Sequence, residues 1–213
     1  MKKKKLVTIL ALSVFSIAAM ADDINYSFSL KDWNHNFKQG SKSDYTNGSV
    51  FTATAKKDDY FVTASFLLPT TYSLNGTYLS RRDTDIALGW NANSNFSIIG
   101  GYKGVSSFQW NSGTYQGDTI FRIAYAGLSG FTSLNQNSFL YGTLTTSLKA
   151  DKSNLSSTDS KPKFQNYEFG YGYVPNKYLQ LSAGYRVQVF NDGHPGNEKA
   201  VLSGVIFGAT YTP

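Results

Sequence analysis

The clearest structural signal in the chain is the segment FQNYEFGYGYVPNKYLQLSAGYRVQV, residues 164–189. Aromatic and aliphatic residues alternate there with glycine, polar and charged residues, on both sides of a short turn at Pro175-Asn176-Lys177. Successive side chains of an extended chain point to opposite faces, so this alternation predicts two strands, each with one apolar and one polar face. Two such strands joined by a three-residue turn form an antiparallel hairpin.

The same alternation recurs along the rest of the chain and predicts ten strands in all. Outside the hairpin, the predicted strands are residues 24–33, 50–56, 60–68, 85–90, 96–104, 119–127, 139–149 and 201–211. Long polar connections at residues 34–49, 69–84, 105–118, 150–163 and 191–200 alternate with mostly short ones. Short turns at one end and long loops at the other are typical of an all-β, up-and-down antiparallel barrel that crosses a membrane. Eight strands are the rival count, if residues 85–90 or 50–56 belong to loops.

The composition favours lipid over water around the barrel. Only 16% of the residues are charged, against about 25% in a typical soluble domain, and the chain holds 15 Tyr, 15 Phe and 19 Gly. The polar strand faces carry mainly Ser, Thr, Gly, Asn and Gln, whereas a soluble barrel of lipocalin type would direct Lys and Glu outward. Aromatic residues near many strand ends fit the girdles at membrane interfaces. Because lipid offers no partners to unpaired backbone groups, the sheet is expected to close.

The first residues have the three parts of a secretory signal peptide. A basic start at Lys2 to Lys5 is followed by an apolar run over residues 6–18 and by the small residues of Ala19-Met20-Ala21. We therefore expect a signal peptide over residues 1–21 and a single barrel domain over residues 22–213. Without residues 1–21, 16 Lys and Arg stand against 14 Asp and Glu, a net charge of +2. That balance argues against a nucleic-acid partner, and the absence of Cys from the sequence means that no disulfide stabilises the fold.

With these features, residues 22–213 resemble the small porin-like outer-membrane barrels of Gram-negative bacteria. The resemblance implies a location in the bacterial outer membrane, contact with outer-membrane lipid and lipopolysaccharide, and insertion by the barrel assembly machinery. It also implies that both termini lie in the periplasm and that five loops lie outside. Such proteins commonly end in Phe or Trp, and this chain departs from that pattern because it ends Tyr211-Thr212-Pro213.

Several polar residues are predicted to line the lumen. Alternation assigns Arg122, Glu168, Gln180, Arg186 and Gln188 to the inner face. A three-residue turn would place Glu168 opposite Gly184, so that Arg186 becomes its diagonal neighbour at about 7–8 Å. One interpretation is an internal ion pair that fills and rigidifies a small barrel. The alternative is a charge filter in a narrow pore.

A catalytic interpretation rests on four residues in two predicted loops. Asp83 and Asp85 end the second long connection, and Asp192 and His194 lie in the last one. An acidic pair facing an Asp–His pair could activate water, with His as the general base. This is similar to the arrangement in omptins, ten-stranded outer-membrane proteases, although the Asp–His pair here falls on the fifth loop and in omptins on the fourth. The residues of the last loop also fit ordinary turn chemistry.

The sequence therefore favours a non-enzymatic outer-membrane barrel, either a narrow passive pore for ions and small solutes or a plugged structural barrel. A binding or adhesion protein is the second interpretation, because residues 41–47 and 149–163 are rich in Ser, Lys, Asn and Asp and are predicted to form mobile surface loops. An omptin-like protease is the third. We expect no cofactor and no metal, since His35 is a lone histidine in a polar predicted loop without a ligand cluster.

Overall fold

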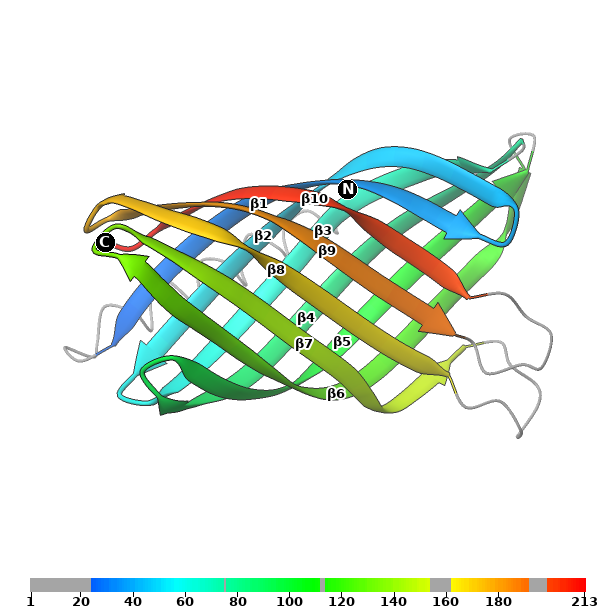
Figure 1. Cartoon of the computed structure of the whole chain (residues 1–213). Coiled ribbons are helices and arrows are strands. Elements are labelled where there is room, and N and C mark those ends of the chain that lie inside the picture. Colours follow the sequence, from blue (N-terminus) through cyan, green and yellow to red (C-terminus); the bar gives the residue numbers. More distant parts are fainter. Residues whose placement is uncertain (1–23, 75, 112–113, 154–161, 192–198) are drawn as a thin grey trace.

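The computed structural model describes residues 24–74, 76–111, 114–153, 162–191 and 199–213, and its elements are all β-strands (Figure 1). The strands are β1 (Asn25–Gln39), β2 (Lys42–Lys57), β3 (Tyr60–Leu74), β4 (Thr77–Asn93), β5 (Phe96–Asn111), β6 (Thr114–Asn135), β7 (Ser138–Lys152), β8 (Lys163–Asn176), β9 (Leu179–Asn191) and β10 (Ala200–Tyr211). The signal peptide predicted at residues 1–21 lies outside the described residues. No helix among the described residues is long and apolar enough to cross a membrane.

The ten strands form one closed barrel in which each strand pairs with its sequence neighbours. The ring closes where β1 pairs antiparallel with β10, from the pair Phe28–Tyr211 to the pair Gln39–Ala200. Closure leaves no exposed sheet edge, which lipid could not satisfy. The predicted ten-stranded antiparallel barrel is thus confirmed, and the rival count of eight is wrong. Figure 1 shows β1 beginning and β10 ending at the same end of the barrel, here called the terminal end.

The strands are longer than expected, and the prediction of long polar loops at the opposite end is wrong for the first three connections. Between β1 and β2, only Gly40 and Ser41 lie outside a strand, so most of the predicted loop 34–49 is paired sheet. Residues 69–84 and 105–118 also belong mainly to strands. The predicted mobile loop 41–47 falls almost entirely in β2. In these segments the outward residues, such as Asn34 and Lys38, are polar and exposed while inward ones such as Phe37 are buried, so the apolar outward face that identifies a membrane strand is lost there.

The outward face of the barrel is apolar on every strand. Each strand contributes at least one large exposed apolar side chain: Leu30, Phe51, Phe66, Leu88, Ile98, Leu128, Leu144, Phe169, Leu181 and Phe207. A tilted strand needs about 9 to 11 residues to cross a bilayer. The strands here run from 12 residues in β10 to 22 in β6, so several extend past the belt that these side chains form.

Candidate functional site

Four of the five residues that the sequence assigns to the lumen line the interior: Glu168, Gln180, Arg186 and Gln188. Arg122 does not, because its side chain is exposed on the outer face of β6. Its neighbour Ile123 and the next alternate residue Tyr125 are the buried ones. Apolar residues occupy both sets of alternate positions in residues 119–127, so the pattern there cannot distinguish the two faces. The assignment of Arg122 to the lumen is therefore wrong.

One group of interior charges consists of Lys31, Glu168 and Arg186 and is called the Glu168 triad here. Lys31 Nζ lies 2.6 Å from Glu168 Oε1. On the other side, Arg186 Nε donates to Glu168 Oε2 at 2.7 Å, and Arg186 Nη2 also contacts that oxygen. The two cations rest on aromatic rings, Lys31 5.5 Å from the ring centre of Tyr141 and Arg186 5.5 Å from that of Trp33. The carboxylate is therefore held between two cations that are themselves packed on aromatic walls.

The pairing of Glu168 differs from the prediction in its register. Glu168 lies directly opposite Arg186, and the predicted partner Gly184 lies opposite Gly170 instead. The ladder between β8 and β9 shifts between Tyr173 and Asn176, in the segment that contains Pro175. Because proline lacks an N–H group it interrupts the ladder, and the turn no longer has the regular three-residue form that the sequence suggested.

Lys31 reaches Glu168 across two intervening strands. The side chain starts on β1 and ends at β8, and β10 and β9 lie between them in the ring. On β10, Gly208 is the residue opposite Lys31. A Cβ atom at Gly208 would lie 2.6 Å from Lys31 Cγ, so glycine leaves the path along the wall open.

A second group of interior charges, the Arg81 cluster, consists of Arg81, Asp83, Asp85, Lys103 and Tyr125. Arg81 binds Asp83 in a bidentate manner, with Nε to Oδ1 at 2.7 Å and Nη2 to Oδ2 at 2.5 Å. Lys103 Nζ lies 3.0 Å from Asp83 Oδ2 and 3.6 Å from Asp85 Oδ2. Tyr125 donates its hydroxyl to Asp85 Oδ1 at 2.6 Å. Both carboxylates are therefore satisfied inside the barrel, and charge pairs of this kind are strong when buried and hydrogen-bonded.

The structure places two of the four residues of the catalytic interpretation inside the barrel and not in a loop. Asp83 and Asp85 lie within β4 and face the lumen, so their prediction as the end of an outer loop is wrong. Asp192 and His194 lie outside the described residues. Among the described residues, no group of three or more His, Cys, Asp or Glu side chains could hold a metal ion. Arg81 and Lys103 were not identified from the sequence, although Arg81, Asp83 and Asp85 share one set of alternate positions that could have indicated a common face.

One hydrogen bond spans the lumen. Arg81 Nη2 donates to Gln188 Oε1 at 2.8 Å. Arg81 belongs to β4 and Gln188 to β9, and these strands stand opposite each other, five positions apart in either direction around the ring. Gln188 in turn donates through Nε2 to Asn166 Oδ1 at 3.2 Å. The interior is consequently bridged from wall to wall at this level.

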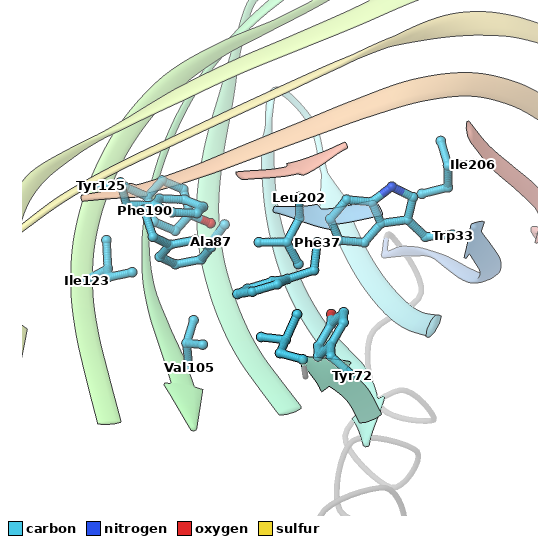
Figure 2. Close-up of a cluster of buried hydrophobic side chains, with 12 residues drawn as sticks. Trp33, Phe37, Tyr72, Ala87, Val105, Ile123, Tyr125, Phe190, Leu202 and Ile206 are labelled. Carbon is cyan, nitrogen blue, oxygen red and sulfur yellow. The ribbon is translucent and has the colours of Figure 1, made fainter. Parts of the chain in front are cut away.

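Apolar side chains pack against this bridge on the side away from the termini. Figure 2 shows Phe37, Tyr72, Phe190 and Leu202 among the residues that converge there. Tyr72, Ile123 and Leu202 have 0% of their surface exposed. Phe37, Tyr72, Ile123, Phe190 and Leu202 are together called the apolar layer here. A small barrel is filled by its own side chains, so an apolar interior is compatible with a membrane protein.

His35, predicted as a solvated loop residue, is buried in the apolar layer. Its Nδ1 lies 2.9 Å from the Trp33 carbonyl oxygen, and its Nε2 lies 2.8 Å from the Tyr72 hydroxyl. Its ring also stacks on that of Trp33, with 4.0 Å between the ring centres. Buried polar groups are normally paired in this way, so the structure gives His35 a packing role.

Three cavities follow one another along the lumen. The cavity nearest the terminal end has a volume of about 440 Å³, and the central one, beside the Glu168 triad, about 290 Å³. These two share four wall residues: Lys31, Thr52, Ser129 and Tyr141. The third, of about 170 Å³, lies toward the opposite end and has a largely apolar wall that includes Phe37, Leu79, Phe121 and Leu202. The third cavity shares no wall residue with the other two, and the Arg81–Gln188 hydrogen bond joins a wall residue of the third cavity to one of the central cavity.

A closed antiparallel barrel with an apolar outer belt and an interior filled by ion pairs and apolar side chains defines a transmembrane β-barrel of the outer-membrane type. No protein-family model matches the sequence. No curated protein matches it either.

Solved structures of similar fold are outer-membrane proteins with low sequence identity. The outer-membrane protease OmpT from Escherichia coli is 12% identical, with 91% of this chain and 98% of that chain covered and a TM-score of 0.48. The translocator domain of the autotransporter NalP from Neisseria meningitidis is 10% identical, with 98% of this chain and 96% of that chain covered and a TM-score of 0.47. Neisserial surface protein A is 10% identical, with 87% of this chain and 96% of that chain covered and a TM-score of 0.40.

Proposed function

We propose that the protein is a non-enzymatic barrel of the bacterial outer membrane whose lumen is closed to through-flow in its resting form. The observation that carries the proposal is the Arg81–Gln188 hydrogen bond between opposite strands, backed by the apolar layer. An ion following the axis would have to break this bond and cross side chains with no exposed surface. Desolvating an ion in an apolar constriction is costly, so such a layer acts as a barrier.

In this proposal the terminal end faces the periplasm, and the long extensions of β1 to β6 project outside. The outer belt contacts outer-membrane lipid and lipopolysaccharide, and the barrel assembly machinery inserts the chain. Asp83 is held by Arg81 and Lys103 and Asp85 by Tyr125, and this pairing supports a structural role over the activation of water.

The test is single-channel recording of the refolded mature protein in a planar bilayer. The wild-type protein should show no steady conductance. A variant without the barrier, Tyr72→Ala with Arg81→Ala and Leu202→Ala, should conduct in discrete steps. The matched control changes three residues of the outer belt, Leu88→Ala, Leu181→Ala and Phe207→Ala, and should stay silent.

Folding of each variant is checked by its heat-dependent electrophoretic mobility. Steady ion-selective steps from the wild-type protein would contradict closure and would support the narrow passive pore instead.

A second candidate function is binding at the outer surface, and the extended hairpins favour it. They carry exposed tyrosines, with Tyr45 74% and Tyr78 49% accessible. Tyrosine on a rigid support makes large contacts at little entropic cost. Cells that display Tyr45→Ser with Tyr78→Ser should then lose adhesion to host cells while keeping a folded barrel, and unchanged adhesion would contradict this candidate.

A further inference from the structure

The two cavities on the terminal side form a blind vestibule with a hydroxyl-rich wall. The cavity near the terminal end is lined mainly by hydroxyl-bearing residues, which are Ser27, Ser29, Thr52, Thr54, Ser129, Tyr141, Ser182 and Thr210, together with Lys31, Gln180, Gly130, Phe131 and Phe139. The apolar layer ends the vestibule on the other side. A small polar molecule could therefore approach the Glu168 triad from the terminal end, and the central cavity beside the triad, about 290 Å³, is close to the lower limit of ordinary ligand sites.

The positive charge of the vestibule is concentrated at the Glu168 triad. In the Arg81 cluster, the two cations Arg81 and Lys103 are balanced by the two carboxylates Asp83 and Asp85. The triad has two cations and one carboxylate, which leaves a net charge of +1. Among the described residues, no second carboxylate forms an ion pair with Lys31 or Arg186. A charge in a partly buried site attracts an ion of opposite sign more strongly than a charge in bulk water does.

Unpaired polar groups lie on the same wall as this excess charge. Ser29, Lys31 and Trp33 alternate along β1: Ser29 lines the cavity near the terminal end, Trp33 lines the central cavity, and Lys31 lines both. Ser29 is 8% exposed, and its Oγ has no hydrogen-bond partner among the described residues. The Nε1 of Trp33, which is also buried, has none within the same ranges. Buried polar groups are almost always paired in folded proteins, so the Ser29 hydroxyl and the Trp33 indole N–H are exceptions.

The chemistry of this wall identifies the kind of partner. An ammonium, a guanidinium and an indole N–H can only donate hydrogen bonds, and a serine hydroxyl can donate as well. Only Glu168 among the described residues accepts from the Lys31 and Arg186 side chains. Ammonium hydrogens and one edge of a guanidinium thus remain for a further acceptor. A ligand that matches these donors and the positive charge is acceptor-rich and negatively charged.

We infer that Lys31 and Arg186 form a binding site for a small oxyanion, a carboxylate or a phosphate, that enters the vestibule from the terminal end, past Ser29. The oxyanion accepts hydrogen bonds from Lys31 and Arg186 and neutralises the excess charge of the triad. The aromatic faces of Trp33 and Tyr141 flank the site and suit an apolar or ring-shaped remainder of the ligand. The inference uses the proposed closure of the lumen only to set the side from which the ligand arrives.

The test is isothermal titration calorimetry on the refolded mature protein in detergent, with sodium phosphate, sodium acetate and sodium chloride titrated separately. Saturable binding of phosphate or acetate is expected, and which of the two binds more tightly distinguishes the two oxyanions. Chloride should bind more weakly because it offers no fixed set of oxygen acceptors. The closure of the lumen does not enter this measurement, so a conducting protein could still bind the oxyanion and a silent one could fail to bind it.

Two variants test the site in opposite directions. Lys31→Met should weaken binding by about tenfold or more, because it removes a partly buried charge and donor. Glu168→Gln removes the competing carboxylate and should tighten binding. The matched control, Lys149→Met, makes the same substitution on an exposed outer residue and should leave affinity unchanged.

Heat-dependent mobility verifies that each variant is folded. If Lys31→Met does not fold, Glu168→Gln still decides the matter. The inference would be overturned by a folded wild-type protein that binds no oxyanion, by chloride binding as tightly as the oxyanions, or by weaker binding in Glu168→Gln.

Discussion

Arg81 and Gln188 join opposite walls of the barrel through a hydrogen bond of 2.8 Å. The same guanidinium binds Asp83 with two hydrogen bonds and lies 4.8 Å from the ring centre of Phe190. One side chain therefore connects a wall-to-wall polar bridge to the apolar layer. Because these contacts are buried, the position of Arg81 is fixed by partners on its own strand β4 and on β9 across the lumen.

Replacing Arg81 by Met should lower the free energy of unfolding by about 3–5 kcal/mol, because Asp83 would lose its bidentate partner inside the barrel. Urea unfolding of the refolded protein in detergent micelles measures the change. Arg82→Met is the matched control on the next residue, whose exposed side chain should contribute about 1 kcal/mol or less. Similar losses in both variants would contradict a special role for the buried guanidinium.

Replacing Leu181 by arginine should lower the free energy of unfolding much more than replacing Gln180 by arginine. Leu181 is exposed on the outer belt, and Leu181→Arg should destabilise the barrel by about 2–4 kcal/mol if it lies near the middle of the bilayer. Gln180 lines the vestibule, so Gln180→Arg should cost far less. Reversible unfolding in lipid bilayers compares the two, and equal costs would mean that the two faces of β9 are assigned incorrectly.

Alanine at Gly204 should prevent normal closure of the seam between β1 and β10. A Cβ atom there would collide with the backbone of Asn34 and His35 on the neighbouring strand. Since backbone cannot move aside as a side chain can, we expect a loss of about 3 kcal/mol or more in folding free energy. Gly142→Ala is the control, because the nearest atom to its Cβ is the Glu168 carbonyl oxygen at 3.8 Å. A folded Gly204→Ala protein as stable as the control would refute the tight contact.

Backbone amides between residues 34 and 49 should exchange slowly with deuterium. The pairs Asn34–Asn47 and Phe37–Asp44 belong to a continuous ladder between β1 and β2, and laddered amides are protected from exchange. Hydrogen–deuterium exchange followed by mass spectrometry measures this protection. Complete exchange within seconds would contradict the β1–β2 ladder and would support the loop predicted from the sequence. The outer-belt strand segment 201–207 serves as the protected reference within the same molecule.

The transmembrane part of the fold could be predicted because lipid imposes a strict chemical alternation on the strands. Residues 179–189 follow it without exception, and the structure confirms a strand there. The extensions of β1 to β6 could not be recognised, since their outward side chains lie beyond the apolar belt and need not be apolar, although inward side chains such as Phe37 and Tyr72 are buried. Residues 34–49 are polar for this reason and not because they form a loop.

The interior was only partly predictable because its contacts join strands that are distant in sequence. Alternation identified Glu168 and Arg186, which lie on neighbouring strands, but not Lys31, which lies 137 residues from Glu168 along the chain. The Arg81–Gln188 contact spans 107 residues and depends on closure of the whole ring. Local patterns give the face of a residue, whereas its partner across the lumen depends on strand number and stagger.

The seam between β1 and β10 also has a consequence for how the protein folds. The first strand of the barrel can acquire its second neighbour only after the last strand has been synthesised and delivered, and Lys31 can reach Glu168 only across that seam. Contacts of such high sequence separation make folding slow, and they leave β1 with an unpaired edge in every earlier intermediate. The chain therefore depends on protection of its N-terminal strand until the C-terminal strand arrives, and the Lys31–Glu168 ion pair can form only when the ring is complete.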